Sequence, residues 1–367
     1  MRRRHHRPTT PAVLVAAALL VGVVAGCSSS DGSDGSAPAT TTSAAASTDP
    51  NAAAVGKTAT SEPVPSAGCG TSSVREVTGE RHELADGRWY LLSTPADHDG
   101  ATPLPVVLDF HGLSEGADIH ALFSELGPYG QANGFVVVQP NGTGTPVAWN
   151  VSSDRTGNPD LVFVDAMLDQ LEADLCVDTS RVYATGLSNG AFLSSVIACT
   201  MADRVAAVAP VAGLTWPPDC DPARPIPVIA FHGTADPILL FNGGVNGAAL
   251  APVIDPDATT TSAPPTTPPP IDLDGEGYPA TAQRWATADG CTGKPTDTDL
   301  TDSVIERTWT CPAASPVEFV IVEGGGHSWP GSTFGPNIEG IVGHTDESIS
   351  ANDLIWKFFQ RFSLPAA

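Results

Sequence analysis

The sequence predicts an α/β fold, with a mostly parallel central sheet and helices on both faces. From residue 88 to the C-terminus, short apolar runs alternate with stretches of helical spacing, and this alternation is typical of βαβ units. The run at residues 134–140 is apolar on both faces, as a strand must be when helices cover both sides of its sheet. A β-branched run at residues 181–185 leads into a glycine-flanked turn and a second apolar helical stretch.

The expected strands and helices alternate along the chain. β-branched and aromatic residues mark the strands, and apolar residues three or four positions apart mark the helices. We expect strands at residues 88–92, 104–110, 134–140, 181–185, 205–211, 226–231 and 317–322, and helices at 117–132, 161–175, 191–198 and 346–359.

The chain is strongly acidic. Its 367 residues include 17 Lys and Arg against 41 Asp and Glu, which gives a formal net charge of −24. This charge repels nucleic acids and anionic membrane surfaces, so we expect neither as a partner. A hydrophobic content of 41% is enough for one large core, and we expect a monomer.

Residues 1–26 have the pattern of an export signal. Four arginines precede an apolar run at residues 12–24, which is too short to be a comfortable membrane span. Small residues stand directly before Cys27, as in bacterial lipoprotein signals, so we expect cleavage before Cys27 and a lipid on its sulfur. The alternative is an ordinary secretory signal in which Cys27 has no role. Both signal types predict a secreted, extracellular or cell-surface protein. The lipoprotein signal also predicts attachment to the membrane, through the lipid on Cys27 alone.

Two tracts of low complexity flank or interrupt the expected folded domain at residues 67–367. Residues 27–66 are rich in Ser, Thr, Ala and Gly, and such a segment buries too little apolar surface to offset its ordering entropy. We expect it to be a flexible tether. A Pro/Thr-rich insertion at residues 251–270 is either a disordered surface segment or a mobile flap near the site.

The chain has seven cysteines. With Cys27 assigned to the lipid, the remaining six predict three disulfides in an oxidising compartment. Many pairings are possible, and the sequence decides only weakly among them. We expect Cys291–Cys311 across a short polar stretch, Cys176–Cys199 on either side of the glycine-flanked turn, and Cys69–Cys220 by elimination.

Residues 186–190 read Gly-Leu-Ser-Asn-Gly between an expected strand and an expected helix. This is the context of a nucleophile elbow, in which a tight turn lifts the hydroxyl of Ser188 above the end of the strand. A neutral serine hydroxyl is a weak nucleophile, so it needs a base that takes its proton during attack. The alternative is a glycine-rich turn with a bystander serine.

Two later loops supply candidates for that base and for the group that orients it. Asp236 and His327 each follow an expected parallel strand, and open α/β sheets bind their ligands at this end of the strands. The order Ser188, Asp236, His327 is the α/β-hydrolase order. We expect His327 to accept the serine proton and Asp236 to hold its imidazole. The alternatives are an ordinary loop histidine and a turn-forming aspartate before Pro237.

The same reasoning gives candidates for the rest of the site. Backbone N–H groups of Asn189 and of Leu113 or Gly112 are the expected oxyanion donors. Trp149 and Trp329 either line an acyl pocket or pack in the core. No Cys/His cluster has zinc spacing and no glycine-rich loop opens a helix, so we expect no metal and no cofactor.

Taken together, the motifs at 186–190, 232–236 and 326–330 resemble those of the secreted esterase family of polyhydroxybutyrate depolymerases, feruloyl esterases and acetylxylan esterases. The segments 111–112 and 176–183 also match, so the resemblance runs from about Cys69 to the C-terminus. It implies an α/β-hydrolase that cleaves esters through an acyl-enzyme. The nearest resemblance is to depolymerase-like esterases of hydroxy acids and polyester fragments, with feruloyl or acetyl esters of plant polysaccharide as the alternative.

Two further functions fit the same features less well. A surface-binding lipoprotein that kept the fold and lost the chemistry has no need of Ser188, Asp236 and His327 together. A peptidase on this fold needs a domain that screens peptides, and the chain has no length for one.

Overall fold

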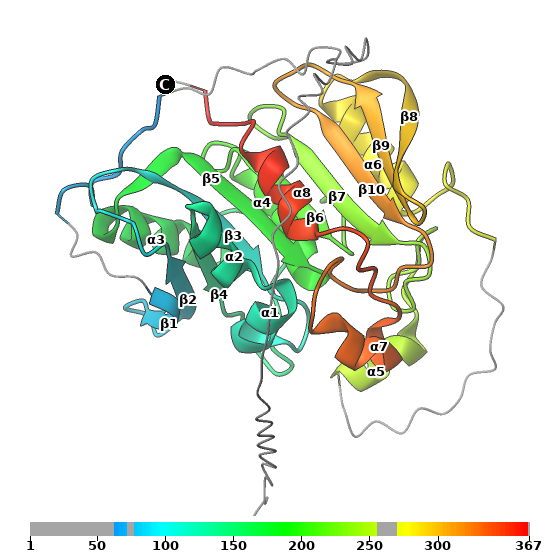
Figure 1. The fold of residues 1–367 in the computed structure, drawn as a ribbon, viewed down its shortest axis with the longest axis horizontal. Helices are drawn as coiled ribbons and strands as arrows, with labels where there is room; N and C mark the ends of the chain where they lie inside the picture. Colours follow the sequence, from blue (N-terminus) through cyan, green and yellow to red (C-terminus); the bar gives the residue numbers. More distant parts are fainter. Residues whose placement is uncertain (1–61, 72–76, 255–269, 366–367) are drawn as a thin grey trace, which may run out of the picture. The chain divides into compact units, whose positions relative to one another are not determined.

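The computed structural model describes residues 62–71, 77–254 and 270–365 (Figure 1). The expected signal peptide, Cys27 and most of the expected tether lie outside these ranges. The described residues belong to one compact unit, Val55–Ala367. None of the helices in the described ranges has the length and apolar character that a membrane crossing requires.

One ten-stranded sheet runs through this unit in the order β1-β2-β4-β3-β5-β6-β7-β10-β9-β8. Neighbouring strands from β4 to β10 pair in parallel, and antiparallel strands extend the sheet at both edges. The strands are β1 (Val77–Glu83), β2 (Trp89–Thr94), β3 (Leu104–Phe110), β4 (Val136–Pro140), β5 (Val177–Leu187), β6 (Ala207–Val211), β7 (Val228–Gly233), β8 (Thr292–Thr301), β9 (Val304–Thr310) and β10 (Val317–Val322).

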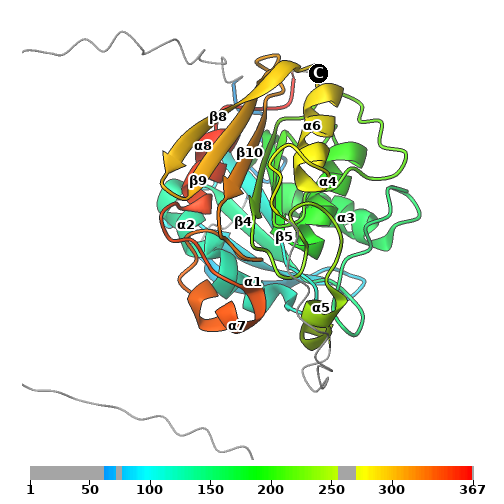
Figure 2. The ribbon, with the colours of Figure 1, turned by 90° about the vertical axis from the view of Figure 1, so that its right-hand side faces the viewer.

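Helices cover both faces of the sheet. In Figure 2, α3, α4 and α6 lie on one side, and α2 and α8 lie on the other. The helical segments are α1 (Gly116–Ser124), α2 (Leu126–Asn133), α3 (Pro159–Asp174), α4 (Asn189–Thr200), α5 (Gly247–Ile254), α6 (Tyr278–Ala288), the 3-10 segment η1 (Gly335–Ile338), α7 (Glu339–Val342) and α8 (Ala351–Phe359).

The side chains of the central strands alternate between two cores, one on each face. Val106 and Leu108 belong to the core that contains residues of α3, α4 and α6. Val107, between them in β3, belongs to the core that contains residues of α2 and α8. A strand with buried neighbours on both faces must be apolar at every position, which is why β3 and β4 read as continuous hydrophobic runs. The α/β-hydrolase type of architecture expected from the sequence is therefore present.

Three features of the fold differ from the expectation. The strands β1, β8 and β9 were not anticipated. The two edge strands, β1 and β8, are polar and largely exposed and so lack an apolar pattern. The single helix expected at 117–132 is two helices, α1 and α2, because Glu125 between them adopts a left-handed φ of 53°. The second half of α5 occupies residues 251–254 of the expected insertion, so a helix extends into that segment.

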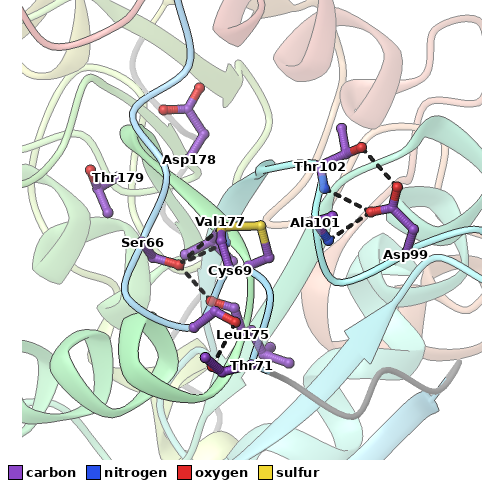
Figure 3. The surroundings of a disulfide bond; sticks show 12 residues. Ser66, Cys69, Thr71, Asp99, Ala101, Thr102, Leu175, Val177, Asp178 and Thr179 are labelled. Carbon is purple, nitrogen blue, oxygen red and sulfur yellow. Dashed lines mark hydrogen bonds between the residues drawn. A yellow bond between two sulfur atoms is a disulfide. The ribbon is translucent and has the colours of Figure 1, made fainter.

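The N-terminal boundary of the domain also lies earlier than expected. Residues 62–66 fall within the predicted tether but lie against the start of β5. The amide of Val64 donates to Asp178 Oδ1 at 2.9 Å. The hydroxyl of Ser66 donates to the carbonyl of Leu175 at 2.6 Å (Figure 3). These hydrogen bonds offset the ordering entropy that composition alone suggested would keep the segment mobile.

Two of the three expected disulfide pairings are wrong. The expected Cys69–Cys220 and Cys176–Cys199 are replaced by Cys69–Cys176 and Cys199–Cys220, whereas Cys291–Cys311 is as expected. The bonds of residues 64–66 bring Cys69 to Cys176 (Figure 3). Arg224 donates to the carbonyl of Ala202 just beyond α4, and this bond draws the loop that carries Cys220 over the helix end that carries Cys199.

Candidate active site

Ser188 stands at a strained turn between β5 and α4. Its φ of 56° and ψ of −114° lie outside the regions that most non-glycine residues adopt, and such strain is common at functional sites. The turn fits only because its flanks are glycines: a Cβ at Gly186 or Gly190 would collide with the carbonyl of Phe110 on the neighbouring strand β3. The half-buried side chain of Ser188 is therefore presented at the carboxyl end of the sheet.

Asp236 and His327 come from the loops after β7 and β10, which are adjacent parallel strands. The Nδ1 of His327 lies 2.7 Å from Asp236 Oδ2, and both side chains are buried. The other carboxylate oxygen, Oδ1, accepts the amides of Ile238 and Leu239 at 2.8 Å each, so the carboxylate is fixed in place. In a neutral imidazole whose Nδ1–H donates to Asp236, Nε2 is left as the acceptor.

The environment keeps Asp236 ionised. Burial alone would raise the pKa of Asp236, but the charge and hydrogen bond of His327, with His232 and the amide of Ile238, hold it below its usual value. Burial lowers the pKa of His232 to about 4, and its Nε2 lies 2.9 Å from the carbonyl of Leu239 and 3.3 Å from Asp236 Oδ2. At neutral pH the site therefore contains an anionic Asp236 and a neutral His232.

One cavity of about 350 Å³ is lined by both Ser188 and His327. Its walls are otherwise mainly apolar, and the apolar lining is aliphatic apart from Phe192. Part of the wall comes from α5 and α7, which the sequence did not assign to the site. Among its apolar lining residues are Leu113, Phe192, Leu239, Leu250, Val253 and Val342.

Two backbone amides at this cavity are free to bind an oxyanion. Leu113 and Asn189 line the cavity, and within the described residues neither amide has a hydrogen-bond partner. Asn189 is the first residue of α4, where the amide has no partner in the helix. The alternative donor Gly112 is wrong, because its amide already donates to Glu115 Oε2 at 2.7 Å.

Trp149 and Trp329 do not line this cavity, so the expectation that they form a substrate pocket is wrong. Trp149 is buried, and its Nε1 donates to the carbonyl of His111 at 2.9 Å. Trp329 is also buried, and its Nε1 donates to Asn352 Oδ1 at 2.9 Å. Each indole is buried with its one donor satisfied, which is the packing role that the sequence left open.

Sequence reasoning missed a polar cluster at residues 109–120, in which Asp109 and His120 are buried and Glu115 is partly exposed. It consists of Asp109, Glu115 and His120, and His120 lies between the two carboxylates. The available signal was Asp109, a charged residue in an otherwise apolar strand and directly ahead of the His-Gly pair at 111–112. Within the described ranges, no set of three or more His, Cys, Asp or Glu side chains is arranged to hold a metal ion.

Comparison with known proteins places these observations in a family, although no family model matches the chain. It is 31% identical over 322 residues to "Putative esterase NocK" of Nocardia uniformis subsp. tsuyamanensis, which covers 83% of this chain and 87% of that protein. It is 26% identical over 285 residues to "Feruloyl esterase B" of Piromyces equi, over 76% of this chain.

The chain spans only 46% of the length of the Piromyces protein. Among solved structures, an acetyl xylan esterase from Aspergillus awamori is 15% identical with a TM-score of 0.49, covering 71% of this chain and 98% of that one. The Nocardia relative matches more than four fifths of both chains at a higher identity. The chain therefore belongs to the esterase family that its three motifs resemble, the α/β-hydrolases that include feruloyl esterases and polyhydroxybutyrate depolymerases.

Proposed function

We propose that the protein is a serine ester hydrolase with Ser188 as nucleophile, His327 as base and Asp236 as the group that orients it. The observation that carries this proposal is the 2.7 Å contact between His327 Nδ1 and Asp236 Oδ2, beside a cavity that His327 shares with Ser188. The strained backbone of Ser188 supports the same assignment, since non-glycine residues in this conformation concentrate at functional sites.

The proposed reaction proceeds in two halves. His327 Nε2 takes the hydroxyl proton as Ser188 Oγ attacks the ester carbonyl, and the oxyanion accepts hydrogen bonds from the amides of Leu113 and Asn189. The imidazolium then protonates the leaving alcohol as the C–O bond breaks, which leaves the acyl group on Ser188. Water, deprotonated by the same nitrogen, attacks the acyl-enzyme and releases the acid. Asp236 stabilises the imidazolium in both halves without taking its proton.

The cavity favours an aliphatic acyl group. Its apolar walls are mainly Leu, Ile and Val, which suit a short hydrocarbon chain better than a planar aromatic ring. Polar residues also line the cavity, among them Ser114, and a serine side chain suits a hydroxyl or a second ester oxygen on the acyl chain. Esters of hydroxy acids, including polyester fragments, meet both requirements.

Feruloyl or acetyl esters of plant polysaccharide are the second candidate substrates, and the name of the Piromyces relative favours them. A panel of hydroxybutyrate oligomers, methyl ferulate and acetylated xylan separates the candidates. We expect the highest kcat/KM on the hydroxybutyrate oligomers. A higher kcat/KM on methyl ferulate would overturn the aliphatic assignment and leave the esterase proposal intact.

A variant that narrows the cavity sharpens this test. Ile341 lies at the cavity rim and is 45% exposed, so Ile341→Trp should obstruct longer acyl chains while it tolerates acetyl esters. Val162→Trp on α3 is the matched control, because Val162 is 50% exposed and does not line the cavity. If Val162→Trp also lowered activity on longer acyl chains relative to acetyl esters, the effect of Ile341→Trp would not arise from the cavity.

The test of the activity itself is Ser188→Ala. We expect p-nitrophenyl ester turnover to fall by on the order of 10⁴-fold or more, because the remaining groups supply only binding and oxyanion stabilisation. A fluorophosphonate should label the wild type and not the variant. A folded wild type that is neither labelled nor active would support the surface-binding alternative.

We also infer that the protein is exported and lipid-anchored at Cys27, on the pattern of the N-terminal sequence. Expression of the full chain with a labelled fatty acid should yield a lipid-labelled protein in the membrane fraction. Cys27→Ala should remove the label. Equal labelling of both forms would contradict the anchor.

A further inference from the structure

We propose that Glu115 is a positioning residue that sets the oxyanion loop, residues 111–116, and that the ion pairs between Asp109, His120 and Glu115 hold it in place. This inference rests on the proposed function, because it assigns the cluster a task in oxyanion binding. None of the three side chains has a role in the proposed proton transfers. Asp109 and His120 are buried next to the loop whose Leu113 amide is the proposed second oxyanion donor, and Glu115 is part of that loop and lines the cavity.

Glu115 fixes the amide next to that donor. Its Oε2 accepts the N–H of Gly112 at 2.7 Å, and its own amide donates to the carbonyl of Gly112 at 3.4 Å. On the other side, the amide of Ser114 donates to the carbonyl of Val147 at 2.8 Å. The two amides that flank Leu113 are therefore both anchored, so the orientation of the Leu113 N–H is set by them.

The carboxylate of Glu115 is in turn held by a charged imidazole. His120 Nδ1 lies 3.2 Å from Glu115 Oε2, and its Nε2 lies 2.7 Å from Asp109 Oδ1. Because both neighbours are carboxylates, both ring nitrogens donate, and His120 is an imidazolium. Burial alone would lower the pKa of His120, but the charges and hydrogen bonds of Asp109 and Glu115 outweigh it and raise the pKa to about 10.

Asp109, in β3, connects the cluster to the sheet. Its Oδ2 accepts the hydroxyl of Ser124 at 2.6 Å and the side-chain amide of Gln139 at 2.9 Å. These donors come from α1 and β4, so the cluster is tied to three elements of the core. A carboxylate with all its donors in place is costly to move, which makes the cluster a rigid support.

The same cluster also contacts the loop that carries His327. The ring of Trp329 packs edge-on against His120 at a centroid distance of 5.9 Å. Its Nε1 donates to Asn352, whose side-chain amide donates to the carbonyl of Ser124 at 2.8 Å. The oxyanion loop and the loop of the proposed base therefore share one support, which fixes their relative position.

The effect of this support should be confined to the transition state. The Leu113 amide meets the oxyanion only after attack, so a misplaced amide lowers kcat and leaves the binding of the ground-state ester nearly unchanged. The complete loss of one oxyanion donor costs on the order of 100- to 1000-fold in kcat. A loop that is displaced rather than absent should lose part of that range.

The experiment compares Glu115→Ala and Glu115→Gln with Glu125→Ala in the full-length chain. Glu115→Ala removes the acceptor for Gly112, and we expect kcat to fall by roughly 10- to 100-fold with KM within about 3-fold of wild type. Glu115→Gln keeps a carbonyl oxygen for Gly112 and should stay within about 10-fold of the wild-type kcat. Glu125 also accepts a loop amide, that of Thr333 at 3.0 Å, but lies outside the cavity, so Glu125→Ala should retain wild-type kcat.

Hydrogen exchange provides a second readout that does not depend on turnover. Glu115→Ala should speed exchange at the Gly112 amide, while Glu115→Gln should leave it protected. A wild-type kcat in Glu115→Ala would overturn the inference and leave the esterase proposal standing. If Glu115→Gln lost as much kcat and as much melting temperature as Glu115→Ala, the inference would also be overturned. That result would indicate a structural role alone. If the wild type is inactive, the esterase proposal fails, and unchanged exchange at Gly112 would show that the positioning inference fails separately.

Discussion

The described residues include two imidazole–carboxylate clusters at the same end of the sheet, and the clusters differ in how many ring nitrogens meet a carboxylate. In the pair of His327 and Asp236, a carboxylate meets only the Nδ1 of the ring. In the cluster of His120 with Asp109 and Glu115, a carboxylate meets each ring nitrogen. The side chain of His327 is 6% exposed at the cavity, whereas that of His120 is 0% exposed.

Under the proposed mechanism, this difference separates a ring that exchanges protons from a ring that supplies a fixed charge. His327 has one ring nitrogen that no carboxylate meets, and the proposed proton transfers use that nitrogen. His120 has no nitrogen left, and its charge holds two carboxylates together. The same residue types can therefore either exchange protons or hold the structure together, according to how many hydrogen-bond acceptors surround the ring. Replacing an aspartate by asparagine in different surroundings tests this distinction.

The largest effect is expected from Asp236→Asn. The asparagine carbonyl can still accept the amides of Ile238 and Leu239, so the fold should survive, but its NH₂ group faces His327 and favours the wrong tautomer. We expect kcat to fall by on the order of 10³- to 10⁴-fold. The measurement is ester turnover alongside circular dichroism of the folded variant. A loss of less than about 10-fold would remove Asp236 from the proposed mechanism.

Asp109→Asn should lower the stability of the fold, in addition to weakening the support of the oxyanion loop. Asp109 accepts from His120, Ser124 and Gln139, so the NH₂ of an asparagine would face a donor in either orientation. We expect a loss of about 3–5 kcal/mol in the free energy of unfolding, measured in urea at neutral pH. The control is Asp203→Asn, since Asp203 is 55% exposed in its ion pair with Arg155 and should cost less than about 1 kcal/mol. Similar losses in both variants would contradict the special role of the buried cluster.

Asp289→Asn should give the smallest effect, and one that depends on pH. Asp289 is buried, its Oδ1 accepts the amide of Ile226 at 3.3 Å, and its Oδ2 has no partner in the described structure. Burial raises the pKa of Asp289 to about 7, above the unfolded value of 3.8. Between these values the folded state binds the extra proton, so wild-type stability should fall as pH rises toward about 7 and stay low above it.

The asparagine cannot ionise and avoids that loss. We expect Asp289→Asn to exceed the wild type by roughly 1–3 kcal/mol near pH 8, with the advantage shrinking toward pH 4. Urea unfolding at the two pH values measures the difference. An advantage of equal size at both would show that Asp289 is ionised in the same way in the folded and unfolded states.

The sequence was most informative where function depends on local turn chemistry. Ser188 was identifiable because its strained turn needs glycines at fixed offsets, and the structure has that turn. Asp236 and His327 follow parallel strands, and the topology of such strands brings their ends to one edge, where the two side chains meet. The central strands were recognisable because burial on both faces leaves no polar positions.

The sequence was least informative where the outcome depends on which distant segments meet. The partner of Cys69 is decided by hydrogen bonds from residues 64–66, which sit in a stretch whose composition indicated mobility. The roles of Trp149 and Trp329 depend on whether each indole N–H has a hydrogen-bond partner. The local sequence around each tryptophan does not indicate such a partner. The walls from α5 and α7 were hidden because they are short apolar segments beside loops.

The attachment of residues 64–69 determines how the domain bears mechanical load. A hydrogen bond joins Val64 to Asp178. Around the start of β5, a hydrogen bond joins Ser66 to Leu175 and a disulfide joins Cys69 to Cys176 (Figure 3). A pull on the chain ahead of residue 62 therefore enters the sheet at a central strand and through a covalent link, and the edge strand β1, which follows in the chain, is shielded from it. An edge strand pulled directly would peel away one hydrogen bond at a time. Held by this end, the domain should resist drag without unravelling.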